Sequence, residues 1–134
     1  MSQGATRIAV AVVERAGEYL IGRRPSNVPL AGYWEFPGGK VHADETPASA
    51  AVRECWEETG LTVRVAAEFP PEVHDYDYGR LELRFFACEL ADAAAEPRAP
   101  FRWVPRGELS RYQFPEANRQ LIERLVTAAG DAAR

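Results

Sequence analysis

The segment from Thr46 to Gly60 constrains the fold more than any other part of the chain, because both of its ends carry helix signals. Thr46 can cap a helix through its hydroxyl, and Pro47 is favoured at the first helical position. Gly60 can adopt the left-handed backbone conformation that ends many helices. The sequence therefore predicts a helix over Pro47–Thr59, about three and a half turns long.

The predicted helix has an apolar face and an acidic face. One side of the helical wheel gathers Ala48, Ala51, Val52, Cys55 and Trp56. Another arc gathers Glu54, Glu57 and Glu58, which repel one another at spacings of three and four residues and lie in the half of the helix where the dipole disfavours anions. Such an arc is either a solvated acidic surface or a site for a hard divalent cation, because Mg²⁺ and Mn²⁺ prefer carboxylate oxygens.

The rest of the chain predicts strands and one more helix. Strands are expected at residues 8–13, 18–24, 61–65, 81–90 and 100–105, with a short one from Trp34 that ends in Pro37-Gly38-Gly39. Residues 25–32 and 91–100 have the composition of loops. A second helix is expected over residues 115–129, with an apolar stripe of Leu121, Ile122, Leu125 and Val126. This order favours an α/β sandwich, and a length of 134 residues favours a single domain over residues 1–134.

Composition and charge exclude several classes of protein. A net charge of −4 makes binding to a nucleic-acid polymer a poor expectation, and an anionic substrate would need a local cation or a metal ion. No apolar run reaches the roughly 18 residues of a membrane span, and the N-terminal segment lacks the order of a secretion signal. Cys55 and Cys88 have no metal or redox spacing, so we expect two small buried hydrophobes in a reducing cytoplasm.

The loop before the predicted helix carries further residues that suit binding of an ion or a phosphate. Gly38 and Gly39 allow the backbone to approach an ion or a phosphate closely, although a plain turn is the alternative. Glu45 ends the same loop. Loop and helix together predict a platform for a metal ion and a diphosphate.

These residues resemble the signature of the Nudix hydrolases, which is a glycine, five residues, a glutamate, seven residues and then R-E-U-x-E-E-x-G-U, with U aliphatic. The matching positions in residues 39–61 are Gly39, Glu45, Arg53, Glu54, Cys55, Glu57, Glu58, Gly60 and Leu61. Every fixed position matches, and only Cys55 departs from the pattern, at an aliphatic position. The resemblance implies a Nudix fold, an α/β/α sandwich with a mixed β-sheet and a loop–helix–loop catalytic module.

The resemblance also implies an activity and a set of roles. A Nudix hydrolase cleaves a nucleoside diphosphate linked to another group, with Mg²⁺ or Mn²⁺ as cofactor. By the family pattern Glu54 and Glu58 are metal ligands, and Glu57 is a ligand or assists the base. The Gly39 region supplies a backbone ligand, while Glu45 and Arg53 tie the loop to the helix. Carboxylates that hold metal ions and accept a proton fit this chemistry.

Outside the signature the chain is similar to the MutT type, which acts on oxidised guanine nucleotides. The segment 34–40 resembles the group's loop before the signature. By this resemblance Phe36 matches an aromatic residue that lines the base pocket, and Gly38 and Lys40 are expected to contact the substrate. Arg24 matches an arginine near the phosphate or sugar, with the adjacent Arg23 as the other candidate. For Phe36 the alternative is ordinary core packing, and for Arg24 it is a surface salt bridge.

Two further positions come from the same resemblance. Asn118 matches an asparagine that reads the purine edge, and an amide offers both a donor and an acceptor for this. Its alternative role is a local hydrogen bond at a helix end. Glu96 is the nearest candidate for a further metal ligand before the last strand, and a solvated linker charge is the alternative.

The expected activity is hydrolysis of a nucleoside triphosphate such as 8-oxo-dGTP to the monophosphate and pyrophosphate, which sanitises the nucleotide pool. Alternative substrates are a dinucleoside polyphosphate, CTP, ADP-ribose or another nucleotide sugar, and Tyr76 and Tyr78 are a weak indication of the first. A non-catalytic nucleotide-binding module is the alternative from another class. The expected partner is a small nucleotide, without a nucleic-acid polymer or a membrane, and the chain is expected to be a monomer or a homodimer.

Overall fold

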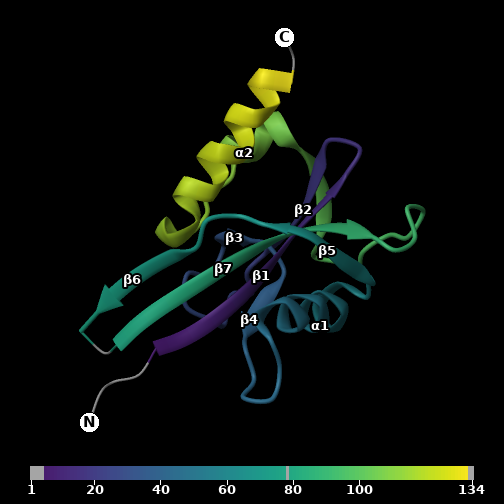
Figure 1. Ribbon diagram of the computed structural model, residues 1–134. Helices are drawn as coiled ribbons and strands as arrows, with labels where there is room; N and C mark the ends of the chain where they lie inside the picture. Colours follow the sequence, from purple (N-terminus) through teal and green to yellow (C-terminus); the bar gives the residue numbers. More distant parts are fainter. Residues whose placement is uncertain (1–4, 78, 133–134) are drawn as a thin grey trace.

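The computed structural model describes residues 5–77 and 79–132, which form a twisted sheet between two helices (Figure 1). The strands are β1 (Ala5–Arg15), β2 (Glu18–Arg23), β3 (Trp34–Glu35), β4 (Gly38–Lys40), β5 (Val63–Glu68), β6 (Glu72–Tyr76), β7 (Gly79–Leu90) and β8 (Arg102–Pro105). The helices are α1 (Pro47–Thr59), α2 (Arg119–Ala132) and two short 3₁₀ segments, η1 (Arg106–Arg111) and η2 (Glu116–Asn118).

The sheet is mixed, as the fold class requires. Its main path runs β3-β2-β1-β7-β5, with β4 paired to β1, β6 to β7 and β8 to β2. The central pair β1 and β7 is parallel, and the other pairs are antiparallel. The central strands are apolar on both faces because both faces are covered.

Each face of the sheet packs against one helix. Alternate β1 residues, Ala9, Ala11 and Val13, face the layer that contains α1, and Val10 and Val12 face the layer that contains α2. The same alternation divides β7, where Phe86 and Cys88 share the α1 core while Leu83 and Phe85 share the α2 core. Figure 1 shows α1 and α2 on opposite sides of the sheet. The predicted α/β/α sandwich is therefore confirmed.

The bounds predicted for α1 agree with the structure. The Thr46 hydroxyl accepts a hydrogen bond from the Ser49 N–H at 3.1 Å, and Gly60 has a φ of 80°. The expected apolar face is wrong in one residue, because Trp56 is 58% exposed and packs outside the core. Trp56 lies at the edge of the apolar arc, one residue past Cys55, which is fully buried.

The C-terminal helix begins later than expected. Pro115 precedes the 3₁₀ segment η2 as its N-cap residue rather than starting an α-helix, and α2 follows from Arg119. The predicted apolar stripe packs into the core, with Leu121, Ile122 and Leu125 buried. The strand expected at residues 61–65 begins at Val63 and runs on to Glu68, and β6 was not expected. Its sequence, EVHDY, is too polar to indicate a strand on its own.

The two cysteines lie in the core as expected. Both are free and buried, and burial raises the pKa of the Cys55 thiol to about 11 and of the Cys88 thiol to about 12. Across the described residues, none of the helices has the length and apolar character needed to cross a membrane.

Candidate active site

The loop before α1 is held against the helix by a short strand. β4 pairs with β1 through Gly38, Gly39 and Lys40, which brings the two glycines under the C-terminal half of α1. A Cβ at Gly39 would lie 2.4 Å from the carboxyl carbon of Glu54, and one at Gly38 would lie 2.6 Å from the Ala9 carbonyl oxygen. Only glycine allows the backbone and the glutamate to approach this closely.

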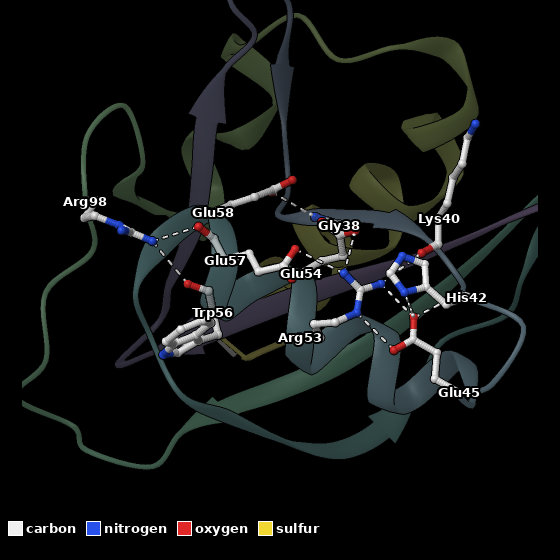
Figure 2. Close-up of polar contacts among 10 residues, drawn as sticks. All are labelled: Gly38, Lys40, His42, Glu45, Arg53, Glu54, Trp56, Glu57, Glu58 and Arg98. Carbon is white, nitrogen blue, oxygen red and sulfur yellow. Dashed lines mark hydrogen bonds and ion pairs between the residues drawn. The ribbon is translucent and has the colours of Figure 1, made fainter.

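Arg53 is the centre of the polar contacts in this region (Figure 2). Its Nε and Nη2 donate to the two carboxylate oxygens of Glu45 at 3.0 and 2.7 Å. Its Nη1 donates to Glu54 and to Glu57, each at 3.1 Å, and Nη2 also reaches the Lys40 carbonyl at 3.1 Å. One planar guanidinium therefore joins two loop groups, the Glu45 carboxylate and the Lys40 carbonyl, to the helical carboxylates of Glu54 and Glu57. The ammonium of lysine cannot supply this geometry.

The Glu45 carboxylate bonds both to Arg53 and to the backbone of its own loop. It accepts from the His42 backbone N–H at 2.9 Å as well as from Arg53. The hydrogen bonds from Arg53 and from His42 lower the pKa of Glu45 to about 2. Glu45 therefore stays ionised and holds the loop closed throughout the neutral range.

The pKa of Glu58 is shifted in the opposite direction from that of Glu45. Burial raises the pKa of its carboxyl to about 8, against the effect of the Gly38 N–H, which donates to it at 3.2 Å. The nearby carboxylates of Glu35 and Glu54 raise it further. The carboxyl of Glu58 therefore resists ionisation in the metal-free protein. Glu35, on β3, was not expected from the sequence, because no local spacing links it to α1.

A divalent cation fits the chemistry of these donors. The surplus of carboxylates around Glu58 and the cradle that Gly39 leaves beside Glu54 are what a hard cation with oxygen ligands requires. Over the residues that the structure describes, no three acidic, histidine or cysteine side chains already converge at metal distance. Arg53 holds Glu54 and Glu57 instead, so a bound cation would draw on carboxylates that Arg53 now engages.

A cleft of about 630 Å³ adjoins the two glycines. Its walls come from β1, β3, β4, β6, β7, η2 and the loops beside β3, and they include Arg24, Glu35, Phe36, Gly38, Gly39 and Asn118. The volume is of the size that takes a small organic ligand. Because Gly38 and Gly39 line the cleft and also contact the acidic helix, the cleft and the carboxylates form one continuous site.

Two predicted base-pocket residues lie in this cleft. Phe36 is 4% exposed and stacks on Phe114, with ring centroids 5.3 Å apart. Asn118 is 9% exposed, and its amide nitrogen lies 3.5 Å from the Pro115 carbonyl, at the limit of a hydrogen bond. Phe36 thus packs in the core and lines the cleft, and the amide of Asn118 is only weakly engaged locally.

The arginine next to the cleft is Arg24. Its guanidinium donates to the Pro29 carbonyl at 2.9 Å and to the Glu35 carboxylate at 2.7 Å. Arg23 is exposed and is not among the cleft residues. Tyr76 also lines the cleft, while Tyr78 lies outside the described residues.

Two expected residues lie apart from the carboxylates. Glu96 is 66% exposed and pairs with Arg15 at 2.8 Å, and among the described contacts none joins it to α1. Lys40 contributes its carbonyl to Arg53, but its side chain is exposed and extends away from the guanidinium (Figure 2). The loop of residues 91–100 instead reaches α1 through Arg98, which the sequence did not single out.

The fold and the site define an α/β/α protein with a loop–helix–loop module beside a cleft that can take a small organic ligand. The model of the NUDIX domain family matches residues 9–124. The chain therefore belongs to the NUDIX family, as a hydrolase of the MutT type. Hydrolases of this family generally use divalent cations and act on small nucleotides.

Individual relatives agree with this placement. The chain is 31% identical over 122 residues to the 8-oxo-dGTP diphosphatase of Escherichia coli (strain K12), covering 89% of this chain and 95% of that protein. A 58-residue stretch is 45% identical to the CTP pyrophosphohydrolase of the same organism, covering 43% of each chain. The crystal structure of the MutT protein from Methanosarcina mazei Go1 has a TM-score of 0.79 at 25% identity, over 96% of this chain and 98% of that one.

Proposed function

We propose that this chain hydrolyses an oxidised purine nucleoside triphosphate, such as 8-oxo-dGTP, to the monophosphate and pyrophosphate with Mg²⁺ or Mn²⁺. The observation that carries the proposal is the continuity of the site, because Gly38 and Gly39 belong both to the cleft and to the contacts of the acidic helix. A base held beside Phe36 and Asn118 would place its phosphates toward those glycines. The likeness to an 8-oxo-dGTP diphosphatase over most of both chains supports the choice of base.

In this proposal different residues bind the cation, the phosphates or sugar, and the base. Glu54, Glu58, Glu57 and the Gly39 carbonyl would hold the cation, which when bound neutralises charge on the phosphates and favours deprotonation of water. Arg24 would contact the sugar or a phosphate, and Lys40 would meet an outer phosphate from the exposed side of the loop. Asn118 would present its donor and acceptor to the base edge.

The reaction itself needs one proton acceptor. The oxygen of water forms a bond to phosphorus, the anhydride bond between the α- and β-phosphates breaks, and the proton of water passes to a carboxylate. Glu57 is the candidate, since its side chain is 49% exposed while Arg53 holds its carboxylate in place. Positioning and charge neutralisation supply most of the rate in phosphoryl transfer.

A panel of substrates tests the proposal. 8-oxo-dGTP, dGTP, CTP, a dinucleoside polyphosphate and ADP-ribose are each incubated with Mg²⁺ or Mn²⁺, and the products are separated. We expect the highest kcat/KM for 8-oxo-dGTP, with pyrophosphate as a product. The reaction in ¹⁸O-labelled water then shows which phosphorus the water attacks. If no compound is turned over with either metal, the proposal is wrong, and binding of the same nucleotides without turnover would favour a non-catalytic nucleotide-binding module.

CTP is the second candidate substrate. The observation that favours it is the 45% identity to a CTP pyrophosphohydrolase over 58 residues, which exceeds the identity to the 8-oxo-dGTP diphosphatase. That stretch covers less than half of either chain. A higher kcat/KM for CTP than for 8-oxo-dGTP in the same panel would establish this alternative.

A further inference from the structure

The C-terminal end of α1 carries an electrostatic problem. The last carbonyls of any helix lack partners within the helix and form the negative end of its dipole. In α1 the last turn holds Glu57 and Glu58 and no basic residue. Gly60 relieves one carbonyl, because its N–H donates to the Trp56 oxygen at 2.9 Å.

Arg98 supplies the missing cation from another part of the chain. Its Nη2 donates to the Glu57 carbonyl at 2.7 Å and to the Trp56 carbonyl at 3.2 Å. Its backbone N–H donates to the Thr59 carbonyl at 2.9 Å. The guanidinium lies across Gly60, where a Cβ would be 3.4 Å from its Nε.

The segment that carries Arg98 is anchored on both sides. On one side Glu96 pairs with Arg15 at 2.8 Å. On the other, the Phe101 N–H donates to the Arg98 carbonyl at 3.0 Å, and the Phe101 ring is buried so closely against Gly22 that a Cβ there would lie 2.8 Å away. The position of Arg98 is therefore set by the sheet and not by α1 alone.

Glu57 is consequently held from two directions. Arg53 binds its carboxylate at 3.1 Å, and Arg98 binds its carbonyl at 2.7 Å (Figure 2). Figure 2 shows the two guanidinium groups on opposite sides of Glu57. We infer that Arg98 is a positioning residue, which fixes the last turn of α1 so that Glu57 and Glu58 face the cation and the phosphates. This inference rests on the proposed function for its catalytic meaning, but its structural part stands alone.

The test compares two variants of Arg98 with a matched control. Arg98→Met keeps most of the length of the side chain and removes the charge. Arg98→Lys keeps the charge but loses the planar guanidinium group. The control is Arg64→Met, because Arg64 is an exposed arginine on β5 whose described ion pair is with Glu89 on β7 and not with α1. We expect Arg98→Met to lower kcat and to weaken Mn²⁺ binding by about two- to fivefold, as for a charge at a helix end, with an unchanged KM. Arg98→Lys should lie between this variant and the wild type.

The sign of the change in Mn²⁺ affinity separates positioning from simple charge. If Arg98 acted only through its charge, its removal would strengthen the binding of another cation. Positioning predicts weaker binding, measured without nucleotide by the electron paramagnetic resonance of free Mn²⁺. Tighter binding in Arg98→Met, or the same affinity and kcat as in Arg64→Met, would overturn the inference.

Amide hydrogen exchange tests the structural role of Arg98 independently of the proposed function. In the protein without metal or nucleotide, the Gly60 amide should exchange about two- to fivefold faster in Arg98→Met than in Arg64→Met. Equal exchange in the two variants would contradict the structural role of Arg98, whatever the activity. Absence of nucleotide hydrolysis in the wild type would instead count against the proposed function alone.

Discussion

The α1 side and the cleft side of the candidate site are built in opposite ways. On the α1 side, residues close in sequence form a dense polar network, with Arg53 in contact with Glu45, Glu54 and Glu57. On the cleft side, Arg24, Phe36 and Asn118 come from three distant segments and meet around a largely apolar hollow. The difference suggests a division of labour in which the α1 side sets the reaction and the cleft side selects the substrate. Changes on one side should therefore leave the property of the other intact.

Neutralising a carboxylate on the α1 side should have the largest effect. We expect Glu54→Gln and Glu58→Gln to lower kcat by roughly a hundredfold or more, because a cation contributes several kcal/mol to charge stabilisation and each variant loses a proposed ligand. The order of preference among nucleotides should not change. Steady-state kinetics on the substrate panel, with circular dichroism as a control for folding, measures both. Near-normal turnover in either variant would contradict the assignment of the metal ligands.

Replacing the central arginine should have the next largest effect. Arg53→Lys keeps the charge but cannot make the paired contact to Glu45 together with those to Glu54 and Glu57. Outer residues that orient metal ligands typically contribute roughly 10- to 100-fold to activity, and we expect a loss in that range. Arg24→Lys is the matched change on the cleft side, and it should raise KM more than it lowers kcat. If the two variants gave the same kinetic pattern, the division between the sides would be wrong.

Changing Asn118, the proposed base reader, should alter selectivity more than rate. Asn118→Ala removes both a donor and an acceptor from the cleft, and a two-point contact to a base contributes about 1–3 kcal/mol to discrimination. We expect the ratio of kcat/KM for 8-oxo-dGTP and CTP to fall by about five- to tenfold, with little change in Mn²⁺ affinity. An unchanged ratio across the panel would exclude Asn118 as the residue that reads the base.

The same division explains what the sequence could predict. The bounds of α1 were predictable because Thr46 and Gly60 act within their own turns, and the signature lies in one continuous stretch. The place of Trp56 was not, since its position on the wheel is at the border of the buried arc and only the packing of neighbouring strands decides its exposure. Elements with weak local patterns, such as β6, become strands only through pairing with β7.

Two residues of the site were missed for a related reason. Glu35 affects Glu58 through space, and Arg98 reaches Glu57 from a loop beyond β7. The distance in sequence between Glu35 and Glu58, or between Arg98 and Glu57, gives no indication that the residues meet. Both contacts depend on how the sheet brings distant segments together. In the loop of residues 91–100 the sequence offered Glu96 as a candidate metal ligand, with a solvated linker charge as the alternative, and in the structure Glu96 pairs with Arg15. The same loop brings the Arg98 guanidinium to the end of α1.

The smallest predicted effect is a pH dependence on the α1 side. The pKa of Glu58 is raised to about 8 in the metal-free protein, and a metal ligand must be ionised to bind. From about pH 7 to about pH 8 the ionised fraction of such a group rises about fivefold, so Mn²⁺ affinity should rise by a similar factor. An affinity that does not change over this interval would contradict the prediction.

Folding provides an independent check on Glu58. Because its pKa in the folded protein lies above the value of an unfolded chain, its contribution to stability is full below about pH 4.5 and is lost as the pH rises through about 8. The free energy of unfolding of the metal-free protein should therefore fall from about pH 4.5 to about pH 8 and level off at higher pH. Glu58→Gln cannot ionise and should show a flatter profile in the same urea titrations, while Asn118→Ala, on the cleft side, should keep the slope of the wild type. Parallel profiles for wild type and Glu58→Gln would contradict the raised pKa of Glu58.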